Sequence, residues 1–212
     1  AASDAGLHTW DDRLADYSPG ALAARRERAR RLLEDVRAAR TAGWKKDDRV
    51  DAVLFCAKLE GEVLYDRVLR FPETNPLLYV DECSNAIFSL LKKEYAPPRQ
   101  RALSATARLR QMPRLLEQAR RNLTEPAALY ARMASASARE MDGLFGETLM
   151  ALAKGLSPAE LGALVSARDA ALEALRSFSA RLDADLATMA PFRPMGEKAY
   201  DDRFLKLALP QV

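Results

Sequence analysis

The residue types that most often perform chemistry are scarce in this sequence. It contains a single histidine, His8, which lies between Leu7 and Thr9 near the start of the chain. A catalytic zinc site usually takes three protein ligands, histidine foremost, and a Ser-His-Asp or Cys-His arrangement needs a histidine as well. We therefore expect no zinc site or nucleophilic triad within this chain, and we expect His8 to cap or pack the first turn.

Paired carboxylates are the remaining candidates for acid–base work. Such pairs are more often solvated or cap helices, and no pair here stands out from the others. No glycine-rich phosphate loop is present, because Gly143 and Gly146 fall inside a predicted helix and no Lys-Ser or Lys-Thr follows them. We predict no catalytic, metal-binding or cofactor-binding residue in this chain, and substrate-binding residues stay unassigned. The carboxylate pairs are Asp11 with Asp12, Glu60 with Glu62, Asp81 with Glu82, and Asp201 with Asp202.

The two cysteines, Cys56 and Cys83, are isolated and form no CxxC motif. Each lies in an apolar, helix-like setting, where a cysteine usually behaves as a small buried hydrophobic residue. A disulfide between neighbouring helices would require an exported protein. Their redox state is left open.

The charge balance is nearly even overall but uneven along the chain. The net charge is +3, from 33 basic and 30 acidic residues. Residues 19–50 carry ten basic and five acidic groups, and residues 92–121 carry nine and two. Solvated faces of amphipathic helices explain such stretches, and few aromatics or reading motifs accompany them, so we predict no nucleic-acid partner. An anionic surface stays open as an alternative. No apolar run is long enough to span a membrane.

Proline placement and apolar periodicity predict an all-α protein. Helices are expected over 19–43, 48–70, 77–94, 97–111, 114–122, 126–154 and 157–190, the last two each about 30 residues long. Ser18 before Pro19 has the pattern of an N-cap, and Ser157 with Glu160 has that of a capping box. No sustained strand alternation is found. We expect an elongated bundle of at least six helices.

Apolar residues at three- and four-residue steps mark the faces expected to be buried. On 48–70 they are Val50, Val53, Leu54, Ala57, Gly61, Leu64 and Val68; on 126–154 they are Tyr130, Met133, Ser137, Met141, Leu144, Phe145, Thr148 and Leu152; on 157–190 they are Leu161, Leu164, Val165, Leu172, Leu175, Phe178, Leu182, Leu186 and Met189. The methionines and aromatics among them are expected to form core and not a cofactor site.

We interpret 1–212 as one helical module, with an irregular opening over 1–18, shorter helices over 19–122, and long helices with a terminal helix over 126–212. The first residue is Ala1 and not methionine. We take this as a processed or trimmed start, from which any targeting segment has been lost, and favour an exported or periplasmic protein.

Several segments resemble one bacterial family, catalogued as domain of unknown function 885. The most specific resemblance is at 6–19, which reads GLHTWDDRLADYSP. The other segments follow in family order: NPLLY at 75–79, EYAPPR at 94–99, LRQMP at 109–113, NL at 122–123 and GEKAY at 196–200.

Members of that family are more than twice as long and resemble helical zinc metallopeptidases with an HExxxGHH-type motif in their later half. These 212 residues contain no such motif, so the resemblance carries over no catalytic or metal residue, and zinc is implied only for the missing half. It implies an N-terminal helical half that forms part of the wall of a substrate cleft, with the remainder of its own chain and a peptide substrate as partners. The alternative is a free-standing helical protein that binds a partner helix or an anionic surface.

Apolar residues at both chain ends predict an exposed face that packs on the missing half or on a second copy. They are Leu7, Trp10 and Leu14 near the start, and Phe204, Leu205, Leu207 and Leu209 near the end. The competing interpretation is that the two ends pack on each other and close a complete bundle.

Overall fold

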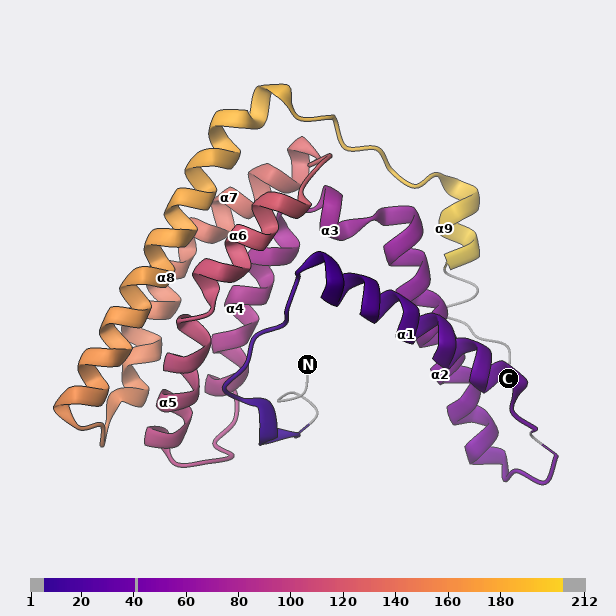
Figure 1. Cartoon of the computed structure of the whole chain (residues 1–212), viewed down its shortest axis with the longest axis horizontal. Coiled ribbons are helices and arrows are strands. Elements are labelled where there is room, and N and C mark those ends of the chain that lie inside the picture. The colour runs from indigo at the N-terminus through magenta and orange to yellow at the C-terminus, as the bar shows by residue number, and fades with distance from the viewer. Residues whose placement is uncertain (1–5, 41, 204–212) are drawn as a thin grey trace. The chain divides into compact units, whose positions relative to one another are not determined.

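The computed structural model describes residues 6–40 and 42–203 of the chain. These residues are helices joined by turns, and no strand occurs among them apart from one isolated bridge between Ala127 and Ala190. The all-α prediction is therefore confirmed (Figure 1). The chain divides into two compact units: unit 1 comprises Ala1–Tyr17 and Pro72–Phe192, and unit 2 comprises Ser18–Phe71 and Arg193–Val212.

Unit 2 is built on a helical hairpin of α1 (Pro19–Ala38) and α2 (Lys46–Leu64), which pack against each other. Ser18 caps α1 as predicted, because its side chain accepts a hydrogen bond from the amide of Ala21 and Pro19 occupies the first helical position. A π-helical segment, Tyr65–Leu69, continues α2 and is followed by its C-cap residue, Arg70. The short helix α9 (Glu197–Arg203) belongs to the same unit.

Unit 1 contains the remaining helices. They are α3 (Phe71–Thr74, of which Phe71 falls in unit 2), α4 (Leu77–Leu91), α5 (Pro98–Leu109), α6 (Met112–Asn122), α7 (Ala128–Gly143) and α8 (Pro158–Asp185). Helix α8 packs along α5, α6 and α7, and α4 packs on α5 and α7. The chain breaks between α5 and α6 at Arg110 and Gln111, so α6 begins at Met112, two residues before the predicted start at 114.

Two long helical stretches lie where the sequence predicts them. Helix α7 continues through a π-helical segment, Leu144–Thr148, to a 3-10 turn at Ala151–Ala153, with a kink at Gly146. Helix α8 begins with the predicted capping box, in which Ser157 and Glu160 each bond the other's backbone amide. The two stretches pack against each other along unit 1.

The buried faces of three helices differ in part from the predicted ones. Leu54 and Val68 on the α2 stretch, Met133 and Thr148 on the α7 stretch, and Leu161 in α8 are exposed. On α7 the buried stripe is built from the small residues Ala131, Ala134, Ser135 and Ala138. Small side chains let α7 approach its neighbours closely, so the bulky Met133 one step away points outward.

Within the described part of the chain, no helix is both long and apolar enough to cross a membrane.

Candidate functional site

The single histidine belongs to a polar cluster in unit 1. His8 lies in a 3-10 turn, His8–Trp10, and its Nδ1 is 2.9 Å from Oδ2 of Asp11. A carboxylate accepts hydrogen bonds, so the imidazole donates from Nδ1 and, when neutral, leaves Nε2 as an acceptor. His8 is partly exposed, whereas Asp11 is buried. Asp11 thus orients the imidazole ring of His8.

Arg108 of α5 brings a cation to the same carboxylate. Its guanidinium is 3.5 Å from Oδ1 of Asp11, and it also donates to the carbonyl of Ala86 at 2.6 Å and to the hydroxyl of Ser89 at 2.9 Å. Both charged side chains are about 6–7% exposed. A buried ion pair of this kind is stable only with such additional hydrogen bonds, and it ties the opening segment to α4 and α5.

Tyr95 covers the other face of the cluster. Its ring stacks on His8 with a centroid separation of 3.6 Å and an interplanar angle of 7°. Burial raises the pKa of the Tyr95 hydroxyl, and a hydrogen bond to Asp11 raises it further. His8 therefore packs, as expected, but the cluster that holds it was not expected from the sequence.

Three amide side chains of unit 1 hold the backbone that follows His8. Gln111 accepts from the amide of Leu14 and donates to the carbonyl of Asp12. Gln118 accepts from the amide of Tyr17, and Asn122 donates to the carbonyl of Tyr17 at 2.8 Å. We call Gln111, Gln118 and Asn122 the amide clamp. It satisfies backbone groups that an extended segment would otherwise pair in a sheet.

Several members of the other carboxylate pairs have separate partners. Glu60 pairs with Arg37, and Glu62 lies 3.4 Å from Lys58. Glu82 accepts a hydrogen bond from the Tyr17 hydroxyl. Oδ2 of Asp202 lies 3.4 Å from Nζ of Lys198. Among the described residues, no group of three or more His, Cys, Asp or Glu side chains is arranged to hold a metal ion.

Both cysteines carry free thiols. Cys83 is completely buried in α4, as expected, and burial raises the pKa of its thiol. Cys56 of α2 is partly exposed.

The apolar chain ends are described in part. Leu7 and Trp10 are exposed, as expected, and Leu14 is half-buried. Phe204, Leu205, Leu207 and Leu209 lie outside the described residues.

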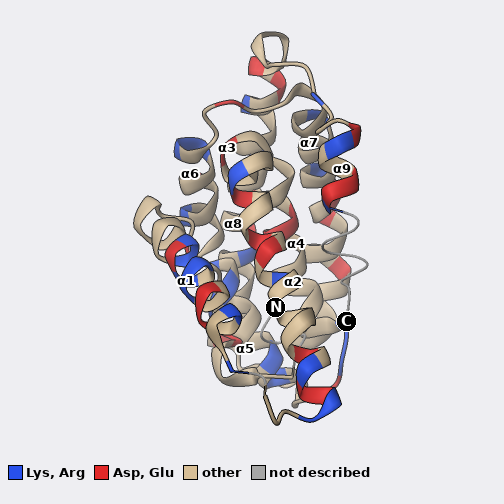
Figure 2. Ribbon diagram, turned by 90° about the vertical axis from the view of Figure 1, so that its right-hand side faces the viewer, with Lys and Arg blue, Asp and Glu red and all other residues tan. Residues whose placement is uncertain are grey.

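The basic stretch over 19–50 is partly neutralised along α1. Glu27 bonds both Arg30 and Arg31, and Arg30 also bonds Glu34, so cations and anions alternate on this helix (Figure 2). Hydrogen bonds from Arg30 and Arg31 lower the pKa of Glu27 to about 2. These are exposed pairs, which contribute little to stability but reduce the local excess of positive charge.

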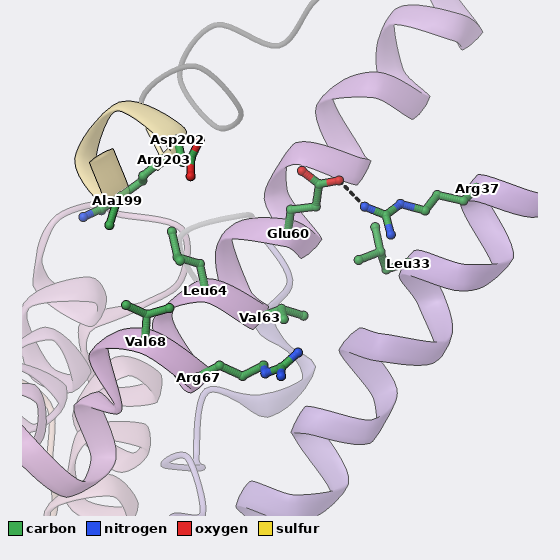
Figure 3. A pocket seen from close by; sticks show the side chains of 10 residues that line it. All are labelled: Leu33, Arg37, Glu60, Val63, Leu64, Arg67, Val68, Ala199, Asp202 and Arg203. Atoms are coloured by element: carbon green, nitrogen blue, oxygen red, sulfur yellow. Dashed lines mark hydrogen bonds and ion pairs between the residues drawn. The ribbon is translucent and has the colours of Figure 1, made fainter. Parts of the chain in front are cut away.

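A pocket of about 850 Å³ lies within unit 2, and it was not predicted from the sequence. Apolar side chains from α1, α2, the π-helical segment and α9 line it, together with arginines and two carboxylates (Figure 3). The lining residues are Leu33, Arg37, Glu60, Val63, Leu64, Arg67, Val68, Ala199, Asp202 and Arg203. Helical periodicity could not reveal it, because residues some 130 positions apart meet there.

The all-helical fold and the opening segment at 6–19 agree with the bacterial family that the sequence resembles. Residues 1–208 match the family described as bacterial protein of unknown function, DUF885, and the chain belongs to this family. His8, Asp11, Tyr95 and Gln111 fall within segments that carried the resemblance, whereas Arg108 immediately precedes one of them. No curated protein matches the chain.

The fold is also similar to a solved structure from Shewanella oneidensis, described as a "putative lipoprotein of unknown function". The TM-score is 0.84 at 19% sequence identity. The match covers 97% of this chain but 38% of that one, so this chain spans less than half the length of the solved protein.

Proposed function

We propose that this chain is the N-terminal helical half of a metallopeptidase-like protein, in which it forms part of the substrate-cleft wall. The observation that carries the proposal is the extent of the two matches. The family match spans 1–208, and the fold match covers nearly all of this chain but 38% of a longer solved protein. In that protein the same fold is one part of a larger chain.

The polar groups described above support a scaffolding role in place of catalysis. Asp11 and Arg108 are buried against each other, and the amide clamp bonds backbone groups of the opening segment. These contacts hold the shape of unit 1, and the zinc ligands would come from the remainder of the protein. The exposed Leu7 and Trp10 offer that remainder an apolar surface to cover.

We also propose that the protein is exported. The solved structure with a similar fold is described as a "putative lipoprotein of unknown function". Fractionation of the bacterium into periplasm and cytoplasm, followed by detection with an antibody to unit 1, tests this localisation.

The proposal is tested on the native protein. Its mass is expected to be more than twice 23.5 kDa, and elemental analysis is expected to find about one zinc per native chain but none on the 212-residue chain. Peptidase activity should appear in the native protein and vanish on chelation. A native protein of 23.5 kDa, or zinc-dependent turnover by the 212-residue chain itself, would overturn the proposal.

A second candidate function is a helical interaction protein. Leu54 and Phe55 favour it, because these adjacent apolar residues of α2 are about half exposed. A native mass of 23.5 kDa together with a co-purifying helical partner would select this alternative.

A further inference from the structure

We infer that the pocket of unit 2 binds a small molecule with an apolar body and a carboxylate. This inference concerns unit 2 alone and does not depend on the proposed peptidase-like role.

The floor of the pocket is apolar. Leu33 comes from α1, Val63 and Leu64 come from α2, and Val68 comes from the π-helical segment. The volume of about 850 Å³ lies in the range of pockets that hold small ligands. An aliphatic or ring group placed there would leave water and contact branched side chains, which is favourable in proportion to the area buried.

The charged side chains that line the pocket differ in whether they have a partner among the described residues. Arg37 bonds Glu60, the guanidinium of Arg203 lies 4.5 Å from the ring centroid of Tyr65, and Asp202 lies 3.4 Å from Lys198. The side chain of Arg67, in contrast, has no ion pair or hydrogen bond with another described residue. It reaches away from its own helix toward α1 (Figure 3).

The backbone is irregular at the same place. Arg67 and Val68 belong to the π-helical segment, and Arg70, which follows it, has φ 48° and ψ 45°. π-Helical turns and left-handed conformations at residues other than glycine are uncommon, and both occur more often at functional sites. Geometric irregularity alone would not define a site, but here it coincides with a cavity and with an exposed cation that has no ion pair or hydrogen bond to another described residue.

The lining favours an anion as the polar part of the ligand. It presents three arginines against two carboxylates, and one of those carboxylates is already bonded to Arg37. The planar guanidinium of Arg67 can donate two parallel hydrogen bonds to a carboxylate. A cationic ligand would meet Arg67 with a like charge.

The inference is tested with octanoate, octanol and octylammonium, which share one alkyl chain and differ in head group. Binding is followed by chemical shifts of the Leu and Val methyl groups in the 212-residue chain. Octanoate is expected to shift Leu33, Val63, Leu64 and Val68 and to bind more tightly than the other two. Equal binding of all three, or tightest binding of octylammonium, would overturn the inference.

Two variants assign the polar contact. Arg67→Gln is expected to weaken octanoate binding about tenfold, since a hydrogen bond to a charged group is lost. Arg28→Gln is the control, because this exposed residue of α1 does not line the pocket. Val68→Asp, at a half-exposed position, should also weaken binding by placing a negative charge in the pocket. Unchanged affinity in both Arg67→Gln and Val68→Asp would refute the assignment.

A second probe pair separates the two sources of such a carboxylate. Acetyl-leucyl-leucine has a free carboxylate and its amide does not. Tighter binding of the acid than of the amide supports the site, and its affinity relative to octanoate shows whether a peptide end or an alkyl acid is preferred. Equal binding of acid and amide contradicts a carboxylate site.

Discussion

The two units of the chain differ in how much of their own surface they bury. The largest fully buried side chains of the described residues, among them Tyr79, Phe145 and Phe178, all belong to unit 1. The buried hydrophobic side chains among the described residues of unit 2 are each 6–8% exposed, and Leu54 and Phe55 are exposed; the buried ones are Leu22, Leu33, Ala57 and Leu59. Burial of apolar area is the main source of stability. We therefore expect unit 1 to be more stable by itself than unit 2, which would gain more from a surface that buries its exposed apolar residues.

The largest expected effect is the loss of a core aromatic from unit 1. Phe145→Ala should lower the free energy of unfolding by about 3–5 kcal/mol, because it leaves a cavity in a packed core. Phe55→Ala in unit 2 should change it by less than about 0.5 kcal/mol, since this side chain is exposed. Urea denaturation followed by circular dichroism measures both, and equal losses would contradict the comparison.

The buried ion pair should rank next. Arg108→Met removes the cation that faces the buried Asp11 and should cost about 3 kcal/mol in unfolding free energy. The matched control is Arg176→Met, which breaks an exposed pair with Asp142 and should cost less than about 1 kcal/mol. If urea midpoints show the same loss for both variants, the cluster does not anchor unit 1 as described.

The two serine caps compare the units directly, since each precedes a proline at the first helical position. Ser157→Ala in unit 1 should cost about 1 kcal/mol. Ser18→Ala in unit 2 should speed hydrogen exchange in the first turn of α1 without moving the unfolding midpoint of unit 1. Exchange measured by NMR on both variants reports this, and a shared midpoint shift would show that the units unfold together.

The amide clamp makes a prediction of similar size at named positions. Gln111→Ala should cost about 1 kcal/mol locally and speed exchange at the amide of Leu14, while Gln118→Ala should do the same at Tyr17. Each variant is the control for the other. Faster exchange at both amides in either variant would mean that the segment is held as a whole and not by individual side chains.

The smallest expected effect is on the pH dependence of helix melting. Hydrogen bonds from Arg30 and Arg31 lower the pKa of Glu27 from its ordinary 4.5 to about 2 in the folded chain. A lowered pKa means that the contribution is present above pH 4.5 and is lost as the pH falls toward 2. The difference in helix melting between the wild type and Glu27→Gln should therefore shrink over this window. A difference that is constant with pH would exclude the carboxylate as its source.

Local signals made much of the fold predictable. Helix starts depend on residues that are only a few positions apart, so they can be predicted from short stretches of sequence. The examples are Ser18 with Pro19, Met112 with Pro113, and Ser157 with Glu160. The end of α1 was less predictable: the helix stops at Ala38, before the glycine at Gly43 that was expected to end it.

The sites were not predictable, because their partners are distant in sequence. No residue close to Asp11 in the sequence predicts its ion pair with Arg108. None close to Leu33 predicts that Ala199 lines the same pocket. Choosing bulky residues for the core also misplaced Met133, because Ala131 and Ala134 provide the close packing on that face of α7. Periodicity identifies a face but does not identify what packs on it.

The amide clamp also sets an order of events during synthesis. Leu14 and Tyr17 are separated from Gln111, Gln118 and Asn122 by 97, 101 and 105 residues. At about 5–20 residues per second, the ribosome needs about 5–20 s to supply these partners after the opening segment has emerged. The opening segment is thus synthesised well before the side chains that hold it, and Leu7 and Trp10 are available to a chaperone throughout that interval.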